Sequence, residues 1–586
     1  MTESKDGSSA HLRWAGAEVI AAETRHALLG PDGPFELTTE PVLGCPHTVF
    51  ARRPKTLRET LNRHSADYRD LVFLASPDRT WTFRDALSQI DALGVLLAER
   101  YQVKAGDRVA IVAANSAEYA LLMWATVTLG AIVTSLNGWW AGPELQAGIE
   151  LTGPVLIAGD ERRLARFDHH SGPAQLPVRL IDALVAESES YRGQVPAPPD
   201  ITEDSPAVIL FTSGTTGRPK GATLSHRNII NFGMVQMLSG ALSAAAVPGA
   251  GDTAPAQPPA QTISILTSPM FHISGLVGVF ITGAFAHAKL VFARPGAWDP
   301  AAYLALTTEH SVTAWSGVPT QFWRILRHPE LASYDVSSLV SVGSGGATFP
   351  PQLVRDLHAR FPKVRLGSGY GMSESTGLGT ITGGDLFISV PDSAGPAQPT
   401  VEVQIRDEFG AVLGAGDVGQ IHLRTPSIFL GYWEDPSATA AVLDEERWYA
   451  TGDYGCISNG LLYLQSRRRD LILRGDENIY PVEIENRLLE HAQIDDAAVI
   501  GVDHPELGSE PKAFIVRSPG AQLSSAEVRD WCALALARYK VPAEVEFVPA
   551  LPYNAAGKLL KQELERLEHK RRLNSAAPRR QPSAGR

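Results

Sequence analysis

The chain is organised around the stretch Leu210–Asn228, LFTSGTTGRPKGATLSHRN. It starts within an apolar run, Ala207–Phe211, which predicts a buried strand. The next segment is Thr212–Gly221, whose three glycines let the backbone bend tightly and bring N–H groups close to an anion. Four hydroxyl side chains add hydrogen-bond donors, and Lys220 adds a positive charge. These residues predict a loop that binds a polyphosphate, although their chemistry alone also suits a flexible Gly/Thr turn.

The loop differs from the common phosphate-binding pattern, which is G-x-x-x-x-G-K-S/T followed by a helix. No Gly-Lys pair stands at the required spacing after Gly214 or after Gly217. The chain instead enters a short β-like segment, Gly221–Leu224, and a helix is expected only after Ser225, a suitable N-cap. Apolar residues at helical spacing then follow: Ile229, Phe232, Val235 and Met237. The sequence therefore predicts a phosphate loop of another kind.

The composition, with 44% hydrophobic and 20% charged residues, is that of a globular protein with a large core. A length of 586 residues suggests about three or four structural units. The net charge of −12 argues against nucleic acid as the main partner. The sequence has no N-terminal apolar export segment and no run of about 18 apolar residues, so we expect no membrane span. It does not decide between a monomer and a homodimer.

The three cysteines, Cys45, Cys456 and Cys532, lie far apart and form no C-x-x-C pair. Unpaired cysteines favour a reducing compartment, so we predict a cytoplasmic protein. Each of the three is expected to be a buried, small hydrophobic residue.

An α/β fold is predicted, with a large N-terminal domain of doubly wound sheets. In Leu57–Asp160, helical patterns alternate with short apolar strands such as Asp107–Val112 and Ala131–Leu136, which is typical of βαβ units. In Val401–Tyr463, short alternating runs separated by glycines predict a small β-rich subdomain. Residues 471–568 have the pattern of a separate, small α+β domain.

The predicted boundaries give an N-terminal arm, residues 1–55, a large N-terminal domain, 56–466, a hinge, 467–470, a C-terminal domain, 471–568, and a disordered basic tail, 569–586. The arm is expected to be loose because Pro41, Pro46 and Pro54 interrupt it. The Ala/Pro/Gly-rich stretch 243–262 is expected to be a flexible surface excursion.

Several other catalytic patterns are missing. Gly343–Ala347 and Gly367–Gly371 begin as dinucleotide-binding turns, but Thr348 and Met372 stand where the last glycine is required. Neither segment contains the G-x-S-x-G turn of a serine hydrolase. The sequence has no H-E-x-x-H and no His/Cys cluster, so a dedicated zinc site is not expected.

Six segments follow one another along the chain in a recognisable order: Thr212–Gly221, Pro269–Gly275, Tyr370–Thr376, Tyr449–Gly455, Ser466–Glu485 and Leu551–Lys558. Together they resemble the phosphate, histidine, adenine–magnesium, ribose, hinge and lysine motifs of the adenylate-forming superfamily. This superfamily includes acyl-CoA synthetases, aryl-CoA ligases, luciferases and amino-acid-activating domains. The resemblance covers nearly all of residues 56–565, and Leu136–Leu145 also resembles the fatty acyl-CoA ligases. It implies an acid–thiol ligase that uses ATP, Mg²⁺ and CoA.

The resemblance also implies roles for individual residues. Lys220 and the loop N–H groups would hold the β- and γ-phosphates of ATP. Glu374 would anchor the magnesium ion, with Thr212 or Thr215 also touching it. The implied phosphate-binding set is Thr212, Ser213, Gly214, Thr215, Thr216, Gly217 and Lys220. From residue chemistry alone, Glu374 also suits the first turn of a helix.

On the nucleoside side, the resemblance implies that Tyr370 stacks on adenine and that Asp453 accepts hydrogen bonds from the ribose hydroxyls with help from Arg467. The implied nucleotide- and CoA-binding positions beyond the phosphate loop are Gly346, Ser368, Gly369, Tyr370, Gly371, Ser373, Asp453, Arg467 and Gly475.

Lys558 is implied to reach the substrate carboxylate and the α-phosphate together, as an electrostatic clamp. Such enzymes rotate a mobile C-terminal domain between two half-reactions, so that Lys558 faces the site first and the hairpin at Gly475 second. Two positions depart from the family. Arg469 stands at the hinge position that is usually Lys or Asp, and Asp476 replaces a glycine near the expected pantetheine path.

His272 is implied to lie at the acyl entrance and to act in catalysis, whereas a lone histidine after an apolar run is also a common core residue. Relatives that activate amino acids carry an aspartate near this position. Here the sequence is Phe271–Ile273, which disfavours an amino-acid substrate. The segments Trp315–Pro319 and Gly343–Gly346 offer glycine and apolar surface without charge. These segments predict an apolar carboxylic acid, aliphatic or aryl, of medium or greater length. The resemblance of Leu136–Leu145 to fatty acyl-CoA ligases implies that the acid is a medium- or long-chain fatty acid.

Four alternatives remain beside that prediction. The acid could be aromatic, or the acyl group could pass to a carrier protein or an amine instead of CoA. A tRNA synthetase is disfavoured because His272–Leu276 lacks the H-x-G-H signature. A non-catalytic scaffold is disfavoured because the central motif residues are all present: Lys220, Glu374, Asp453, Arg467 and Lys558.

Overall fold

The computed structural model describes residues 11–13, 22–167, 176–213, 219–245, 261–296, 298–345, 349, 351–466, 472–475, 477–479, 481–518, 520–552 and 561–576. Internal contacts divide the chain into two units. The first contains most of the chain up to Arg467. The second contains Arg468–Arg586 together with the short stretches Trp139–Glu144 and Ser213–Pro219.

The first unit contains a seven-stranded sheet in the order β21-β11-β10-β7-β6-β8-β9. The five strands from β10 to β9 run parallel, and β21 pairs antiparallel with β11. This confirms the strands predicted around the phosphate loop. The bounds are β6 (Arg108–Val112), β7 (Ile132–Ser135), β8 (Leu156–Gly159), β9 (Val178–Leu180), β10 (Pro206–Ser213), β11 (Pro219–Ser225) and β21 (Gly431–Tyr432).

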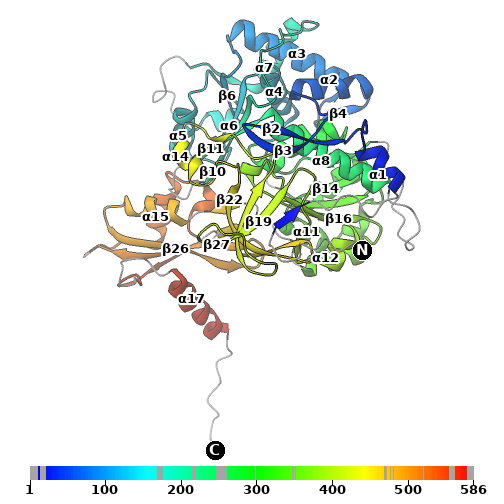
Figure 1. The fold of residues 1–586 in the computed structure, drawn as a ribbon. Coiled ribbons are helices and arrows are strands. Elements are labelled where there is room, and N and C mark those ends of the chain that lie inside the picture. Colours follow the sequence, from blue (N-terminus) through cyan, green and yellow to red (C-terminus); the bar gives the residue numbers. More distant parts are fainter. Residues whose placement is uncertain are drawn as a thin grey trace, which may run out of the picture. The chain divides into compact units, whose positions relative to one another are not determined.

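Helices α2, α3, α4 and α7 gather beside this sheet (Figure 1). Local capping fixes where the longer ones begin. Thr82 and Asp85 form a capping box at the start of α3, and the Ser116 hydroxyl accepts a hydrogen bond from the N–H of Tyr119 at the start of α4. The bounds are α2 (Leu57–Asp67), α3 (Phe83–Arg100), α4 (Ala117–Thr128), α5 (Gly142–Thr152), α6 (Glu161–Leu164), α7 (Ile181–Ser188) and η1 (Glu189–Tyr191).

An eight-stranded sheet of the same unit has the order β17-β16-β15-β14-β12-β13-β4-β5. Its six central strands are parallel, and the two edge strands β17 and β5 are antiparallel. The bounds are β4 (Val72–Ala75), β5 (Thr80–Thr82), β12 (Ile263–Ile265), β13 (Lys289–Val291), β14 (Ala314–Ser316), β15 (Ser341–Gly345), β16 (Arg365–Tyr370) and β17 (Thr380–Gly383).

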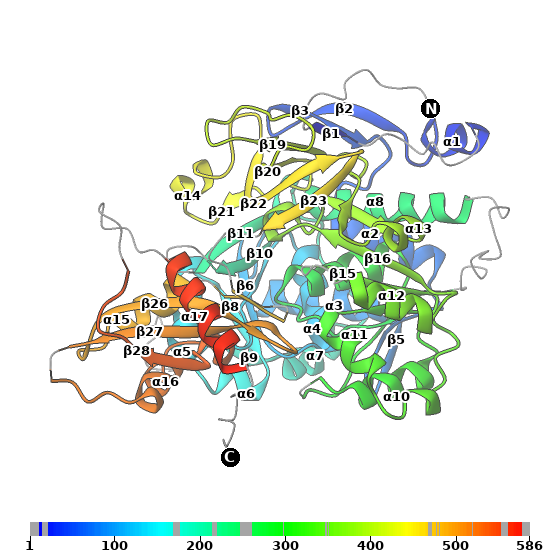
Figure 2. The same cartoon turned by 90° about the horizontal axis from the view of Figure 1, so that it is seen from below.

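Helices α10, α11 and α12 lie together beside this second sheet (Figure 2). The helix that follows β11 is α8 (His226–Ala245). The helices and turns that follow strands of the second sheet are α9 (Ile273–Leu276), the π-helical turn η2 (Val277–Gly283), α10 (Pro300–His310), α11 (Pro319–Leu326), η3 (Leu331–Ser333), α12 (Pro351–Arg360), η4 (Ser373–Ser375) and α13 (Asp385–Ser389). The N–H of Asn228 donates to the Ser225 hydroxyl at 3.2 Å, which confirms Ser225 as the cap of α8.

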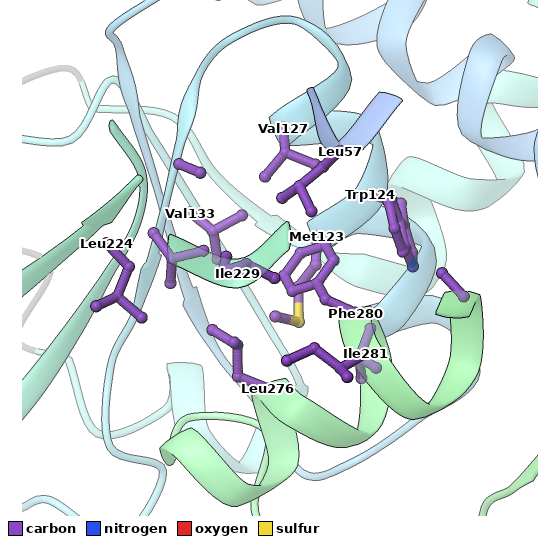
Figure 3. Close-up of a cluster of buried hydrophobic side chains, with 14 of the residues drawn as sticks. Leu57, Met123, Trp124, Val127, Val133, Leu224, Ile229, Leu276, Phe280 and Ile281 are labelled. Carbon is purple, nitrogen blue, oxygen red and sulfur yellow. The ribbon is translucent and has the colours of Figure 1, made fainter. Parts of the chain in front are cut away.

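A large hydrophobic core lies between elements of the first unit, and a second cluster of buried residues surrounds Trp315. In Figure 3, Met123 and Trp124 from α4 lie close to Phe280 and Ile281 from η2. The rings of Trp124 and Phe280 meet edge to face, with centroids 4.7 Å apart. Leu224, which follows the phosphate loop, is fully buried in the same core. The strand that leaves the loop is thereby anchored in the interior.

The β-rich subdomain predicted from residue 401 onward is an antiparallel six-stranded sheet in the order β1-β19-β20-β22-β23-β18. Figure 2 shows β19, β20, β22 and β23 side by side. The bounds are β1 (His11–Arg13), β18 (Ser393–Gly395), β19 (Glu402–Arg406), β20 (Gly419–Arg424), β22 (Tyr449–Ser458) and β23 (Leu461–Ser466), with the short helix α14 (Pro436–Ala440).

The expectation of a loose N-terminal arm was wrong for residues 37–50. This region forms an antiparallel hairpin of β2 (Leu37–Val42) and β3 (Cys45–Phe50), preceded by α1 (Ala22–Leu29). Pro41 and Pro46 stand opposite each other in the register, so the hairpin accommodates both prolines. Cys45 was expected to be buried, but it is only half-buried, and its thiol donates to the carbonyl of Glu445.

The second unit contains a small sheet in the order β25-β24-β27-β26, with β28 beside β27. Its core contains Ile472, Ile484, Val499 and Ile515. The bounds are β24 (Ile472–Arg474), β25 (Glu477–Ile479), β26 (Ile494–His504), β27 (Gly508–Arg517), β28 (Glu544–Phe547), α15 (Pro481–Leu489), α16 (Ser525–Ala533), η5 (Arg538–Lys540) and α17 (Lys561–Ala576).

Two details of the second unit differ from the sequence expectations. The pattern of residues 525–538 predicts one helix over that whole range, but α16 ends at Ala533. Disorder was predicted from His569, but α17 continues to Ala576. The ion pair of Arg572 with Glu568 on the same helix and with Glu544 on β28 explains the extension. The expected α/β fold class, with several sheets, a β-rich subdomain and a C-terminal α+β region, is confirmed.

Candidate functional site

The predicted phosphate loop connects β10 to β11. β10 has β7 on one side and β11 on the other within the seven-stranded sheet, and it ends at Ser213. β11 begins at Pro219, so Lys220 is the second residue of the strand that follows the loop. Loops that follow the carboxyl ends of parallel strands are where open α/β sheets bind ligands. The loop residues Gly214, Thr215, Thr216 and Gly217 lie outside the described residues.

Glu374 lies on the turn η4, directly after β16 of the eight-stranded sheet. Its side chain is buried, and the Tyr432 hydroxyl donates to its Oε1 at 2.9 Å. Burial raises the pKa of Glu374, while hydrogen bonds from Tyr432 and Thr212 act in the opposite direction. Thr212 comes from β10, so the two sheets bring predicted site residues into contact.

Lys220 contacts the same tyrosine. Its Nζ lies 4.9 Å from the centroid of the Tyr432 ring. Sequence reasoning missed Tyr432, which lies in the two-residue strand β21 far from the recognised motifs. The only sequence signal is an aromatic residue after a glycine at the end of an apolar run, and such residues are common in cores.

Tyr370 and Asp453 were assigned to adenine and ribose, and the structure places their side chains together. The Tyr370 hydroxyl donates to Oδ2 of Asp453 at 2.9 Å. Tyr370 ends β16, and Asp453 lies in the middle of β22. The backbone N–H of Asp453 also donates to the Thr451 hydroxyl at 3.1 Å. Residues 83 positions apart thus form one polar pair, as a shared nucleoside site requires.

The other predicted nucleotide residues on this strand surround Tyr370. Ser368 and Gly369 lie in β16 and pair with Ser344 and Gly345 of β15. Gly371 follows, and a Cβ there would lie 2.3 Å from the carbonyl oxygen of Gly377. Only glycine permits this close approach, which turns the chain back and presents Ser373 and Glu374.

His272 caps the short helix α9 with its backbone, and its N–H donates to the carbonyl of Pro269 at 3.0 Å. The side chain is half-buried, and its ring lies 4.8 Å from the ring of Phe271. Among the segments predicted to line the acyl pocket, Trp315 is buried in the core and donates to the Thr307 hydroxyl.

Unlike the buried Trp315, the glycines of β15 lie next to open space. A Cβ placed at Gly343 or Gly345 would meet no other atom within 4 Å. Open space therefore lies beside the carboxyl end of β15, one strand from the nucleotide residues of β16. Gly346 lies outside the described residues.

Three predicted residues of the second half of the site cannot be placed. Arg467, Arg469 and Lys558 lie outside the described residues, as does Asp476. Gly475 is described: it occupies the turn between β24 and β25 with φ of +66°. This left-handed conformation favours glycine. Its N–H donates to the carbonyl of Leu507 at 2.8 Å.

A magnesium ion was predicted beside Glu374. Within the ranges described above, no cluster of three or more His, Cys, Asp or Glu side chains could hold a metal ion. Glu374 and Thr212 nevertheless bring a carboxylate and a hydroxyl together. Mg²⁺ prefers oxygen ligands and is often bound by one or two carboxylates plus substrate phosphates. The residues present therefore fit a magnesium ion that arrives with a nucleotide.

In the described part of the chain, no helix is long and apolar enough to cross a lipid bilayer.

The site thus combines a lysine after a phosphate-type loop with a Tyr–Asp pair suited to a nucleoside, as in an enzyme that forms adenylates. A model of the AMP-binding enzyme family matches residues 57–433, and a model of the AMP-binding enzyme C-terminal domain matches residues 483–558. The chain belongs to the AMP-binding enzyme family.

Individual relatives narrow the class. A feruloyl-CoA synthase of Amycolatopsis is 32% identical over 471 residues, covering 79% of this chain and 89% of that protein. A Mycobacterium tuberculosis CoA ligase for a methyl-dioxo-octahydroindenyl propanoyl group is 31% identical, covering 88% and 99%. A Bacillus subtilis o-succinylbenzoate CoA synthetase structure aligns with a TM-score of 0.74 at 26% identity, covering 86% and 98%. The chain is an AMP-forming acid–thiol ligase of the CoA-ligase type.

Proposed function

We propose that this enzyme activates an apolar carboxylic acid, a medium- or long-chain fatty acid, in two half-reactions. The acid and ATP first give an acyl-adenylate and pyrophosphate, and CoA then displaces AMP to give an acyl-CoA. The observation that carries the choice of acid is the open space beside Gly343 and Gly345, where an added Cβ would meet no other atom within 4 Å. Because β15 pairs with β16, this space adjoins the strand that bears Tyr370.

In the first half-reaction, a carboxylate oxygen attacks the α-phosphorus and pyrophosphate leaves. The attacking oxygen is a weak nucleophile, so stabilising the developing charge is the main task. Lys220 and the N–H groups of the phosphate loop hold the pyrophosphate end. Glu374, with Thr212 or Thr215, would hold a magnesium ion bound together with ATP, and such an ion would neutralise phosphate charge.

The nucleoside end is held by Tyr370 and Asp453. Their hydrogen bond at 2.9 Å fixes the carboxylate next to the aromatic ring, which supports adenine and ribose recognition by this pair. Arg467 assists at the ribose. Ser368, Gly369, Gly371 and Ser373 supply backbone and hydroxyl groups around the ring.

The remaining roles belong to Lys558, Arg469, the hairpin at Gly475 and His272. Lys558 binds the substrate carboxylate and the α-phosphate together. After adenylate formation, rotation about Arg469 replaces Lys558 by the hairpin at Gly475, and His272 shields the pocket between the half-reactions. Separating the two states in time lets different groups occupy one place.

An aromatic acid is the second candidate. The similar feruloyl-CoA synthase supports it, and so does the open space beside Gly343 and Gly345, which would also admit a ring. A flat ring and an alkyl chain differ in the depth of pocket that they need, so one series of acids separates the two candidates.

The test is a panel of carboxylic acids, run with and without CoA, in which pyrophosphate and thioester are measured separately. Straight-chain acids from acetate to palmitate are compared with benzoate, cinnamate and ferulate. The proposal predicts the highest kcat/KM for a fatty acid of at least medium length. A preference for acetate or for an amino acid would contradict it. Pyrophosphate release without any thioester would move the acceptor from CoA to a carrier protein or an amine.

A further inference from the structure

Tyr432 contacts two charged residues of the site through different parts of one side chain. Its hydroxyl donates to Oε1 of Glu374 at 2.9 Å. Its ring lies under the ammonium group of Lys220, with Nζ 4.9 Å from the ring centroid. A hydrogen bond to a carboxylate and a cation over an aromatic face are both charge-assisted contacts, which depend on geometry.

The backbone of Tyr432 is fixed to the strand that bears Lys220. Tyr432 pairs with Ala222 in the register of β21 and β11. Its N–H donates to the Thr439 hydroxyl at 2.9 Å, and the N–H of Trp433 donates to the carbonyl of Gly221 at 2.7 Å. The ring is held in addition by the edge of Phe429, with centroids 5.0 Å apart. The aromatic face therefore has little freedom to move away from Lys220.

Glu374 belongs to the other sheet, because it follows β16. Its backbone carbonyl accepts the N–H of Phe429 at 2.8 Å, so the segment that carries Tyr432 also holds the turn η4. A buried carboxylate that loses a hydrogen-bond donor is costly and adopts other rotamers. Tyr432 thus links β11, the strand that bears Lys220, to η4, the turn that bears Glu374.

We propose that Tyr432 is a positioning residue for adenylation: its hydroxyl fixes the Glu374 carboxylate, and its ring fixes the Lys220 ammonium group, so that both meet the same triphosphate. This inference rests on the proposed function. The two contacts separate by substitution, because Tyr432→Phe removes only the hydroxyl and Tyr432→Leu removes the hydroxyl and the ring.

Tyr101 provides a matched control in the same unit. Its hydroxyl donates to Glu187 at 3.2 Å, and the guanidinium of Arg179 lies over its ring at 5.6 Å. Tyr101 is the C-cap residue of α3, a helix that contains none of the predicted site residues. Tyr101→Phe removes the hydroxyl, which also accepts a hydrogen bond from Nε of Arg179 at 3.0 Å, and Tyr101→Leu removes the hydroxyl and the ring.

The experiment measures ATP affinity by calorimetry, kcat and KM for pyrophosphate release, and the melting temperature of the full chain. Tyr432→Phe is expected to lower kcat about 10–100-fold, the worth of one hydrogen bond to a charged group, and to leave the Kd for ATP within about twofold. Tyr432→Leu is expected to raise that Kd as well, by about 3–10-fold. The Tyr101 variants should keep wild-type kinetics.

Three outcomes would overturn the inference. Tyr432 variants that match the Tyr101 variants in kcat and Kd would show that neither contact matters. A loss that follows the melting temperature alone would give Tyr432 a merely structural role. If Tyr432→Phe and Tyr432→Leu raised the Kd for ATP by the same factor, the ring would have no role in holding Lys220. If the wild type releases no pyrophosphate with any acid, the proposed function fails by itself, and calorimetry still decides whether the ring holds Lys220 for ATP.

Discussion

Lys220 in the first unit and Lys512 in the second both lie over an aromatic ring, but their charges have different partners. Nζ of Lys220 is 4.9 Å from the Tyr432 ring, and Nζ of Lys512 is 5.2 Å from the Phe514 ring. Lys512 pairs with three carboxylates at 2.8 to 3.3 Å, those of Glu544, Glu546 and Glu568. Across the residues that the structure describes, no carboxylate forms an ion pair with Lys220.

The difference distinguishes a lysine whose charge stabilises the fold from one that, in the proposed function, binds a ligand. Burial alone would lower the pKa of Lys512, but hydrogen bonds with Glu568 and Glu546 hold the pKa above its ordinary value. Its charge is therefore used within the fold, where it joins β27, β28 and α17. Lys220 has an aromatic face on one side and, among the described residues, no ion-pair partner, which suits the proposed role of receiving an anion.

The largest loss of activity is expected when Lys220 is replaced. Lys220→Ala should lower the rate of pyrophosphate release about 100–1000-fold, because one preorganised group that stabilises developing charge is lost. The melting temperature should stay close to that of the wild type, because Lys220 forms no ion pair with a described carboxylate. Stopped-flow pyrophosphate detection measures the rate, and Lys104→Ala, on the exposed surface, is the control. A loss of stability larger than the loss of activity would reverse the assignment.

Lys512→Met is the complementary change. It should lower the free energy of unfolding by about 2–3 kcal/mol, because three carboxylates lose their shared, largely buried cation. Denaturant unfolding of the full chain measures this. Lys570→Met on the exposed side of α17 serves as the control and should change stability by less than about 0.5 kcal/mol. A stable Lys512→Met variant would show that the carboxylates do not depend on this lysine.

His226, the first residue of α8, extends the comparison to a buried group that has a structural role. Burial lowers the pKa of His226 to about 4, and its Nδ1 accepts the N–H of Leu57 at 3.2 Å. Since the unfolded value is about 6.5, the unfolded chain binds the proton more readily. Stability is therefore present above about pH 6.5 and is lost as the pH falls toward 4.

For the wild type, this group alone should cost about 2 kcal/mol of unfolding free energy between about pH 7.5 and pH 5. His226→Gln keeps an acceptor for the Leu57 N–H and should lose that part of the pH dependence. Denaturant unfolding at the two pH values gives the difference, and the other histidines cancel because both proteins contain them. Equal pH dependence in the two proteins would contradict the burial argument.

The smallest effect is expected for a substitution that fills the open space beside Gly345. Gly345→Leu should lower kcat/KM for the longest acid accepted about tenfold relative to a shorter one, because the side chain fills space that the acyl group needs. Stability should not change, because a Cβ at Gly345 meets no neighbouring atom within 4 Å. The ratio of kcat/KM values across the acid series is the measurement. An unchanged ratio would place the acyl group elsewhere.

The sequence predicted those parts of the fold that depend on local patterns. The strand at Ala207–Phe211, the cap at Ser225 and the alternation of helices and strands follow from periodicity and capping chemistry, which act over a few residues. The hairpin at residues 37–50 was missed because prolines usually interrupt strands, whereas here Pro41 and Pro46 face each other across the strand pair. That register is not visible in the order of residues.

The site shows the same division. Glu374, Lys220, Tyr370 and Asp453 were found from their motifs, and the structure brings them together in two contacting pairs, one of them through Tyr432. Tyr432 itself could not be found, because its importance comes from β21 pairing with β11 from more than 200 residues earlier, a contact that is set by tertiary packing. In the same way, no local signal placed three carboxylates around Lys512.

Acid-dependent exchange of labelled pyrophosphate into ATP shows directly whether the adenylate forms before CoA acts and without CoA. The wild type should catalyse this exchange with its preferred acid in the absence of CoA. Lys558→Ala should lose the exchange, yet still form thioester from supplied acyl-adenylate and CoA. Absence of exchange with every acid, or equal loss of both steps in Lys558→Ala, would contradict the account.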